Sequence, residues 1–135
     1  MSETRMISIV DDDALARDGI KELVESLGYK ALTFVSAEHF LQSGQIAQTV
    51  CLISDIQMPG LSGLDLQEEL HAQGYRTPVI LITAYPSEQQ RTRAFGAGAI
   101  GFLSKPFAEQ SLIDCLSAAM KHAGNRANMQ IARQS

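Results

Sequence analysis

The sequence predicts a doubly wound α/β domain with a five-stranded parallel sheet and five helices. Three observations support this prediction: short apolar runs recur along the 135 residues, segments with helical periodicity separate these runs, and 45% of the residues are hydrophobic while 19% are charged. Strand patterns that alternate with helix patterns are typical of parallel sheets covered by helices. A chain of this length can bury one core but is too short for two ordinary domains, so we expect one domain.

The first predicted strand is the apolar run Ile7–Val10, and the first predicted helix begins among the aspartates that follow it. The dipole of a helix favours negative charge at its start, which suits these aspartates. Gly28 is typical of the residue that ends a helix. Between these ends, apolar residues recur at the spacing of one helix face: Ala16, Ile20, Leu23, Val24 and Leu27.

The middle of the chain repeats the pattern twice. A weaker apolar run, Ala31–Val35, predicts the second strand, and a short helix is expected from Ser36 to about Leu41. The run Val50–Ile53 predicts the third strand. The third helix is expected to begin near Ser62 and to end at Gly74, where a glycine favours a helix end.

The fourth strand is predicted at Val79–Ile82 and the fifth at Ile100–Leu103. Between them, Ser87 is followed three residues later by Gln90, which is the spacing of a capping box. We therefore expect the fourth helix to run from this point toward Gly96.

The last predicted helix has one apolar stripe and should end near His122. Beyond Ala123 the sequence loses apolar periodicity. We therefore predict that residues 1–122 form the domain and that residues 123–135 are a C-terminal tail or the start of a linker. The stripe comprises Leu112, Ile113, Leu116, Ala119 and Met120.

Charge and hydropathy exclude two classes of function. Eleven basic and fifteen acidic residues give a net charge of −4, which opposes the electrostatic attraction that drives most nucleic-acid binding. No apolar run approaches the roughly 20 residues of a membrane span, and the first six residues lack the apolar core of a signal peptide. We expect a cytoplasmic domain that contacts neither membrane nor, by itself, nucleic acid.

The cysteines and histidines are expected to be structural or solvated. Cys51 and Cys115 form no C-x-x-C pair and lie within apolar segments, where a thiol behaves as a small buried hydrophobic group. His39, His71 and His122 fall on polar helix positions or helix ends, so we expect them to face solvent.

Polar side chains gather where the predicted strands end: Asp11, Asp12 and Asp13 after the first, Asp55 after the third, Thr83 after the fourth and Lys105 after the fifth. In an open α/β sheet these ends share one edge, where ligands bind. Carboxylates about 4 Å apart repel by roughly 4 kcal/mol per pair at an effective dielectric constant near 20, so the cluster needs a cation or raised pKa values, and a divalent metal is the simplest remedy. Oxygen ligands without nearby histidine or cysteine favour Mg²⁺.

This group of side chains suits phosphoryl transfer. A carboxylate can attack phosphorus and hold the phosphoryl group as an acyl phosphate. Lys105 and the metal would neutralise charge on the phosphoryl oxygens, while Thr83 donates a hydrogen bond to one of them. Each residue alone has a simpler interpretation, as a helix cap, a loop opener or a solvated lysine. Their joint occurrence at four strand ends favours a functional site.

Four motifs together resemble the receiver domain of bacterial two-component response regulators, with the FixJ-type regulators as the most similar kind. The resemblance covers residues 6 to about 122, and it implies a flavodoxin-like (βα)5 fold with strand order 2-1-3-4-5. The motifs are IVDDD at residues 9–13, SDIQMPGLSG at 54–63, LITAY at 81–85 and FLSKPF at 102–107.

The resemblance implies a role for each residue of the edge. Asp55 would be the phosphoacceptor, which takes a phosphoryl group from a sensor histidine kinase. Asp11 and Asp12 would organise Mg²⁺ together with Asp55 and the backbone carbonyl of Gln57. Thr83 and Lys105 match the hydroxyl and lysine of the family, and the peptide bond between Lys105 and Pro106 would be cis.

The resemblance also implies a switch. Phe102 would be the aromatic residue whose rotation follows the movement of Thr83 toward the phosphoryl group. Gln57 and Tyr85 occupy the variable positions that flank this group and tune its lifetime. In relatives the fourth helix, fifth strand and fifth helix form a homodimer or release an effector domain, so a C-terminal DNA-binding output domain outside this chain is one expected context.

Two other functions share part of this pattern. Haloacid-dehalogenase-type phosphatases also begin with a strand and Asp11-x-Asp13, but Leu15 replaces their threonine or valine and no later acidic pair follows Lys105. If Asp55 were the nucleophile of such a phosphatase, Gln57 would stand at the position where the phosphatase needs a general acid. A scaffold that works without phosphorylation would not require Asp12, Asp55, Thr83 and Lys105 together. We therefore expect a phosphoacceptor that catalyses only its own phosphorylation and dephosphorylation, not an enzyme with multiple turnovers.

Overall fold

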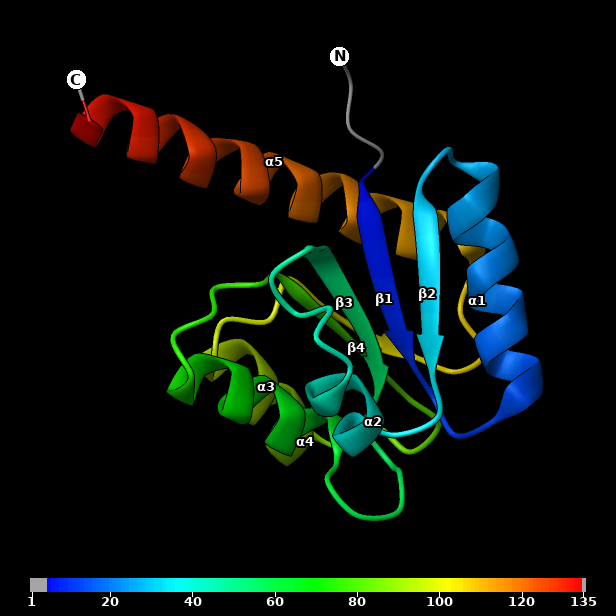
Figure 1. Cartoon of the computed structure of the whole chain (residues 1–135). Helices are drawn as coiled ribbons and strands as arrows, with labels where there is room; N and C mark the ends of the chain where they lie inside the picture. The colour runs from blue at the N-terminus through cyan, green and yellow to red at the C-terminus, as the bar shows by residue number, and fades with distance from the viewer. Residues whose placement is uncertain (1–4, 135) are drawn as a thin grey trace.

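The apolar runs form the strands of one parallel sheet. The computed structural model describes residues 5–134, with side chains for residues 5–122. Within this range the sheet has five strands in the order β2-β1-β3-β4-β5, and a helix follows each strand (Figure 1). The predicted doubly wound fold and its strand order are therefore confirmed.

The elements alternate strictly along the described chain. The strands are β1 (Met6–Val10), β2 (Lys30–Phe34), β3 (Thr49–Asp55), β4 (Val79–Thr83) and β5 (Gly101–Ser104). The helices are α1 (Ala14–Ser26), α2 (Ala37–Gln42), α3 (Gly63–Ala72), α4 (Glu88–Gly96) and α5 (Glu109–Gln134).

Two apolar layers cover the sheet because successive side chains of a strand point to opposite faces. On one face, Ile7 and Ile9 of β1 pack with α1 and α5. On the other face, Val10 and Leu52 pack with α2, α3 and α4. Cys51 is fully buried in the first layer and Cys115 packs against it, in agreement with their predicted structural role.

Side-chain caps set the starts of four helices, since the first backbone N–H groups of a helix have no partner within it. Asp13, Ser36, Ser62 and Ser87 each accept a hydrogen bond from a backbone N–H of the helix that follows. The capping box predicted at Ser87 is only half formed, because the Gln90 side-chain oxygen accepts no hydrogen bond. A complete capping box stands instead at Ser62 and Asp65.

The last helix is longer than predicted. We expected it to end near His122, whereas α5 continues to Gln134 and extends beyond the body of the domain (Figure 1). A helix that has already formed on the core can be extended at one hydrogen bond per residue without a new nucleus. The alanine, arginine, methionine and glutamine residues that predominate after Ala123 favour helix, whether or not they face a core. The boundary between domain and tail at residue 122 stays a prediction.

Among residues 5–134, no helix has both the length and the apolar character that crossing a bilayer requires.

Candidate functional site: an acidic cluster at the carboxyl edge of the sheet

The sheet topology brings Asp11 and Asp55 together. Strands β1 and β3 are neighbours, and their register pairs Val10 with Ser54, so the next residue of each strand lies at the same edge. The chain leaves β1 toward β2 and later returns to the other side of β1, which makes this edge the switch point where open α/β sheets bind ligands. Asp11 is only 1% exposed and Asp55 only 7%.

Three carboxylates form an acidic cluster at this point. One oxygen each from Asp11, Asp12 and Asp55 lies within 4.8 Å of the others. Asp12 is exposed, unlike the other two, so its carboxylate faces the solvent side of the cluster. Asp13 has a different role, because it caps α1 by accepting a hydrogen bond from the Leu15 N–H at 3.1 Å.

Lys105 reaches the acidic cluster from the end of β5. Its Nζ lies 3.0 Å from Oδ2 of Asp11 and 3.5 Å from Oδ2 of Asp55. The backbone directs the side chain there, since the Lys105 N–H donates to the Thr83 carbonyl at 2.8 Å. The peptide bond from Lys105 to Pro106 is cis.

Burial and charge act on these groups in opposite ways. Burial raises the pKa of Asp55, the charge of Asp11 raises it further, and the Lys105 ammonium only partly offsets both. Burial alone would lower the pKa of Lys105, but its hydrogen bond and charge interaction with Asp11, and then those with Asp55, raise it above its ordinary value. The Lys105 ammonium thus pairs with two of the three carboxylates, and the net negative charge of the acidic cluster attracts a further cation.

Asp11 is held by several backbone groups. Its Oδ1 accepts a hydrogen bond from the Asp13 N–H at 2.9 Å, and its own N–H donates to the Phe34 carbonyl at 3.1 Å. Arg17 of α1 donates from Nη1 to the Asp11 carbonyl at 2.8 Å. This contact of Arg17 was not predicted from the sequence. The only available signal was the position of Arg17 in the helix that follows the aspartates.

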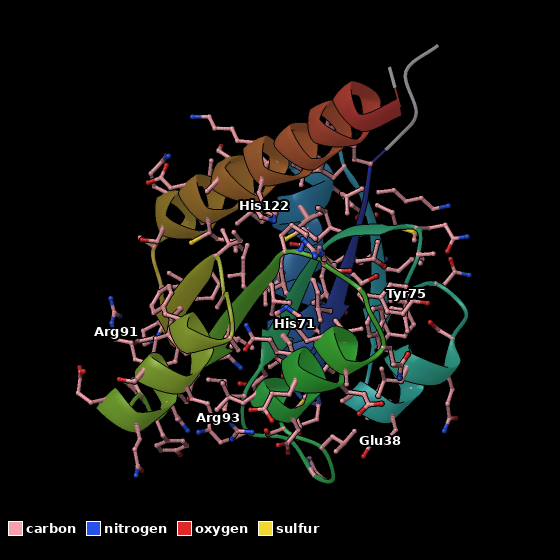
Figure 2. All side chains as sticks on the ribbon, turned by 90° about the vertical axis from the view of Figure 1, so that its left-hand side faces the viewer. Glu38, His71, Tyr75, Arg91, Arg93 and His122 are labelled. Carbon is pink, nitrogen blue, oxygen red and sulfur yellow. The ribbon has the colours of Figure 1, made fainter. Side chains whose placement is uncertain are left out.

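The loop after Asp55 is fixed by two glycines and one glutamate. Gly63 begins α3 directly against the Asp55 carbonyl, and a Cβ there would collide with that oxygen. Gly60 has a φ of 78°, and a Cβ there would collide with the Glu38 carboxylate. Glu38 of α2 accepts a hydrogen bond from the Leu61 N–H at 3.0 Å and faces this loop (Figure 2). No local pattern in the sequence pointed to Glu38, because its partner is 23 residues away.

Thr83 lies beside Gln57 and makes no hydrogen bond to Asp55. Its hydroxyl is fully buried, donates to Oε1 of Gln57 at 2.6 Å and accepts from the Tyr85 N–H at 3.0 Å. The Gln57 residue is exposed overall, and the Tyr85 side chain is 75% exposed. The structure therefore gathers the predicted residues in two groups, with Lys105 among the carboxylates and Thr83 held by Gln57.

Phe102 of β5 is half-buried against the α2, α3 and α4 side of the core. The guanidinium of Arg91, on α4, lies 5.9 Å from its ring centre and 5.2 Å from that of Phe95. Both distances are in the range of cation–π attraction. In Figure 2, Arg91 lies on the outer side of α4, whereas Arg93 lies toward α3, where it pairs with Asp65 and Glu68.

The histidines take no part in the acidic cluster. His39, His71 and His122 are exposed, as predicted.

Comparison with known proteins identifies relatives that match most of this chain. The family model of the response regulator receiver domain matches residues 7–117. Nodulation protein W of Bradyrhizobium diazoefficiens is 38% identical over 96% of this chain and 57% of its own length. The transcriptional regulatory protein FixJ of Azorhizobium caulinodans is 32% identical over 98% of this chain and 63% of its own length. The chain thus spans less than two thirds of these curated relatives.

A solved structure agrees with these matches. The response regulator StyR superimposes with a TM-score of 0.89 and 36% identity, covering 98% of this chain and 67% of that one.

Proposed function

Because this chain belongs to the response regulator receiver domain family, we propose that it accepts a phosphoryl group from a histidine kinase on Asp55. One observation carries the proposal: Oδ1 of the buried Asp55 has no hydrogen-bond partner among the described residues, while Oδ2 faces Lys105. A free carboxylate oxygen beside an ammonium group is suited to attack phosphorus. The new O–P bond forms as the P–N bond to the donor imidazole breaks, and the imidazole nitrogen takes up a proton.

The donor set fits Mg²⁺. The acidic cluster offers hard carboxylate oxygens, one of them without a partner, and Mg²⁺ binds through one or two carboxylates together with phosphate oxygens and water. Asp11, Asp12 and Asp55 would hold the ion, with the Gln57 carbonyl as the further ligand expected from the family resemblance. When bound, the ion supplies positive charge that neutralises the phosphoryl oxygens.

The chain's own residues orient the reaction. Lys105 fixes Asp55 through Oδ2 and so leaves Oδ1 for the incoming phosphorus. The hydrogen bonds to Asp11 hold the neighbouring carboxylate in place. Gln57 stands where a phosphatase would need a general acid, so each domain is expected to catalyse only its own phosphorylation and dephosphorylation and to turn over about once.

The signal would leave through the face formed by α4, β5 and α5. Phe95 is 42% exposed there, and the half-buried Phe102 shares Arg91 with it. We propose that phosphorylation at Asp55 draws Thr83 inward and lets Phe102 follow, which alters homodimerisation or contact with an output domain. Since the curated relatives are longer than this chain, a C-terminal DNA-binding domain is one such output. We further propose a cytoplasmic location, which is typical of the receiver domain family.

A labelling experiment tests the proposal. The protein is incubated with acetyl phosphate and Mg²⁺, and intact mass is measured. Wild type should gain one phosphoryl group, whereas Asp55→Asn should gain none. Absence of labelling in wild type, or equal labelling of both proteins, would contradict the assignment of Asp55. Multiple turnovers on a phosphate monoester would instead support a phosphatase.

A further inference from the structure

The single donor of the Thr83 hydroxyl is already used, and its partner is Gln57 rather than Asp55. A hydroxyl group carries one proton, and Thr83 gives that proton to Oε1 of Gln57 at 2.6 Å. The Tyr85 N–H already donates to the hydroxyl oxygen at 3.0 Å, which leaves the proton to point toward the glutamine carbonyl. While this arrangement holds, Thr83 cannot donate to a group on Asp55.

Two acceptors therefore compete for one proton. Strands β3 and β4 are neighbours with Asp55 opposite Ile82, so Thr83 lies one residue beyond the phosphoacceptor on the adjacent strand. A phosphoryl group on Asp55 would bring charged oxygens to this edge. Hydrogen bonds to charged acceptors are roughly twice as strong as neutral ones. The Thr83 hydroxyl should therefore donate its hydrogen bond to the phosphoryl group when that group is present. Without the phosphoryl group, it donates to the neutral side chain of Gln57.

We propose that the Gln57 side chain is a latch that holds the Thr83 hydroxyl away from Asp55 until phosphorylation releases it. The inference rests on the proposed function and assigns Gln57 as a positioning residue that acts through Thr83. It makes the resting state of the switch depend on a specific side-chain hydrogen bond, in addition to the packing of Phe102.

The backbone next to Gln57 suits a latch because hydrogen bonds of Ile56 fix it. The preceding Ile56 N–H donates to the Ile82 carbonyl at 2.9 Å, and the Ile56 carbonyl accepts from the Gly63 N–H at 3.0 Å. The latch is thus anchored to both β4 and the start of α3. Any change in the Thr83 hydrogen bond must come from the side chain of Gln57 or from the β4 end.

A released Gln57 side chain has space to occupy. Gln57 lines a cavity of about 580 Å³ between its own loop and α4, together with Gln90 and Arg93. The side-chain oxygen of Gln90 is buried and has no hydrogen-bond partner among the described residues. Both glutamines line the same cavity, so a Gln57 side chain released from Thr83 can turn into this space without displacing the backbone.

Binding of beryllium fluoride with Mg²⁺, a mimic of the phosphoryl group, tests the latch. Gln57→Met keeps the length of the side chain and removes the acceptor. We expect this variant to bind the mimic roughly 2- to 10-fold more tightly than wild type, since one neutral hydrogen bond no longer has to be broken. Affinity is measured by titration followed through backbone amide NMR signals.

A double-mutant cycle separates the latch from other effects of position 57. Thr83→Val keeps the shape of the residue and removes the hydroxyl, so Gln57 has nothing to hold. In that background, Gln57→Met should leave the affinity unchanged. The NMR signal of the Tyr85 amide, which donates to Thr83, should shift in the single variant Gln57→Met before any mimic is added.

Controls keep the outcomes distinct. Gln73→Met makes the same substitution at an exposed position on the far end of α3 and should change neither measurement. Unaltered or weaker binding by Gln57→Met, or an equal gain in the Thr83→Val background, would overturn the latch. If wild type itself bound no beryllium fluoride and accepted no phosphoryl group from acetyl phosphate, the proposed function would fail instead.

Discussion

The Lys105 ammonium lies 3.0 Å from the Asp11 carboxylate, although the two residues are 94 positions apart in the sequence. Asp11 is almost fully buried, whereas the Lys105 side chain is 22% exposed. The pair thus connects the ends of β1 and β5, the first and last strands along the chain, and Asp55 at the end of β3 lies between them in the sheet order. Because Lys105 lies nearer to Asp11 than to Asp55, its charge mainly compensates Asp11.

Removal of this ammonium should destabilise the domain. Lys105→Met leaves Asp11 and Asp55 as neighbouring buried carboxylates, and loss of one partner of a buried ion pair costs about 3–5 kcal/mol. The partial exposure of Lys105 reduces this to about 1–3 kcal/mol. Urea unfolding in Mg²⁺-free buffer measures the difference. An exposed lysine, Lys121, supplies the control, and Lys121→Met should change stability by less than about 0.5 kcal/mol.

Asp55→Asn should have the opposite effect. The raised pKa of Asp55 means that the folded state binds its proton more tightly than the unfolded state does, so its ionised form at pH 7 lowers stability. We expect Asp55→Asn to raise the free energy of unfolding by about 1 kcal/mol at pH 7 without Mg²⁺. The difference should shrink as the pH falls through the folded pKa, because wild-type Asp55 then becomes neutral.

Asp65→Asn is the matched comparison for this pH dependence. The Ser62 N–H and then Arg93 lower the pKa of Asp65, so its ionised form stabilises the fold. The same substitution there should lower stability at pH 7, and this loss should persist until the pH reaches the pKa of the unfolded state, shrinking only as the pH falls further toward the lowered pKa of the folded state. Urea unfolding between pH 4 and pH 7 measures both variants, and equal signs would contradict the assigned environments.

Mg²⁺ should stabilise the domain through the acidic cluster. A ligand that binds only the folded state at ten times its dissociation constant adds about 1.4 kcal/mol. Asp12→Asn should weaken Mg²⁺ binding by roughly tenfold or more. Asp13→Asn removes a neighbouring charge but keeps a capping side chain, so it should have a much smaller effect. Titration calorimetry compares the variants, and equal losses would place the ion elsewhere.

The strand ends were predictable from sequence because short-range rules govern them. Apolar runs predicted the strands, and the edge rule for open sheets then placed Asp11, Asp12, Asp55 and Lys105 together. The structure confirms that these four residues meet.

The partners of Thr83 and Asp55 were less predictable, because they depend on side-chain contacts between distant elements. Thr83 was expected to face the phosphoryl group, and nothing in the local sequence showed that Gln57 holds its hydroxyl. Glu38 and Arg17 likewise act through single backbone groups of other segments. The predicted end of α5 near His122 was wrong for another reason. Apolar periodicity indicates contact with a core, whereas backbone hydrogen bonds and helix propensity can extend a helix beyond its core.

Gly63 should be necessary for the position of Asp55, the proposed phosphoacceptor. Gly63→Ala places a Cβ against the Asp55 carbonyl, so the loop must shift and stability should fall by about 1–3 kcal/mol. Labelling by acetyl phosphate should also slow, since Asp55 moves with its carbonyl. Gly19, within α1, has open space at its Cβ, and Gly19→Ala should stabilise by about 0.5–1 kcal/mol without changing the labelling rate. Labelling of Gly63→Ala at the wild-type rate would show that the contact is not needed.

Phe102→Ala should separate phosphorylation from its output. The Phe102 ring packs against the core on the α2, α3 and α4 side and lies near the Arg91 guanidinium, and its side chain has no polar atom that could bind the acidic cluster. Labelling of Asp55 should therefore persist, because Lys105 and the carboxylates are untouched. The phosphorylation-dependent change in self-association, measured by sedimentation with and without acetyl phosphate, should weaken. If Phe102→Ala kept the full wild-type coupling, the signal would have to leave the domain by a route that does not include β5.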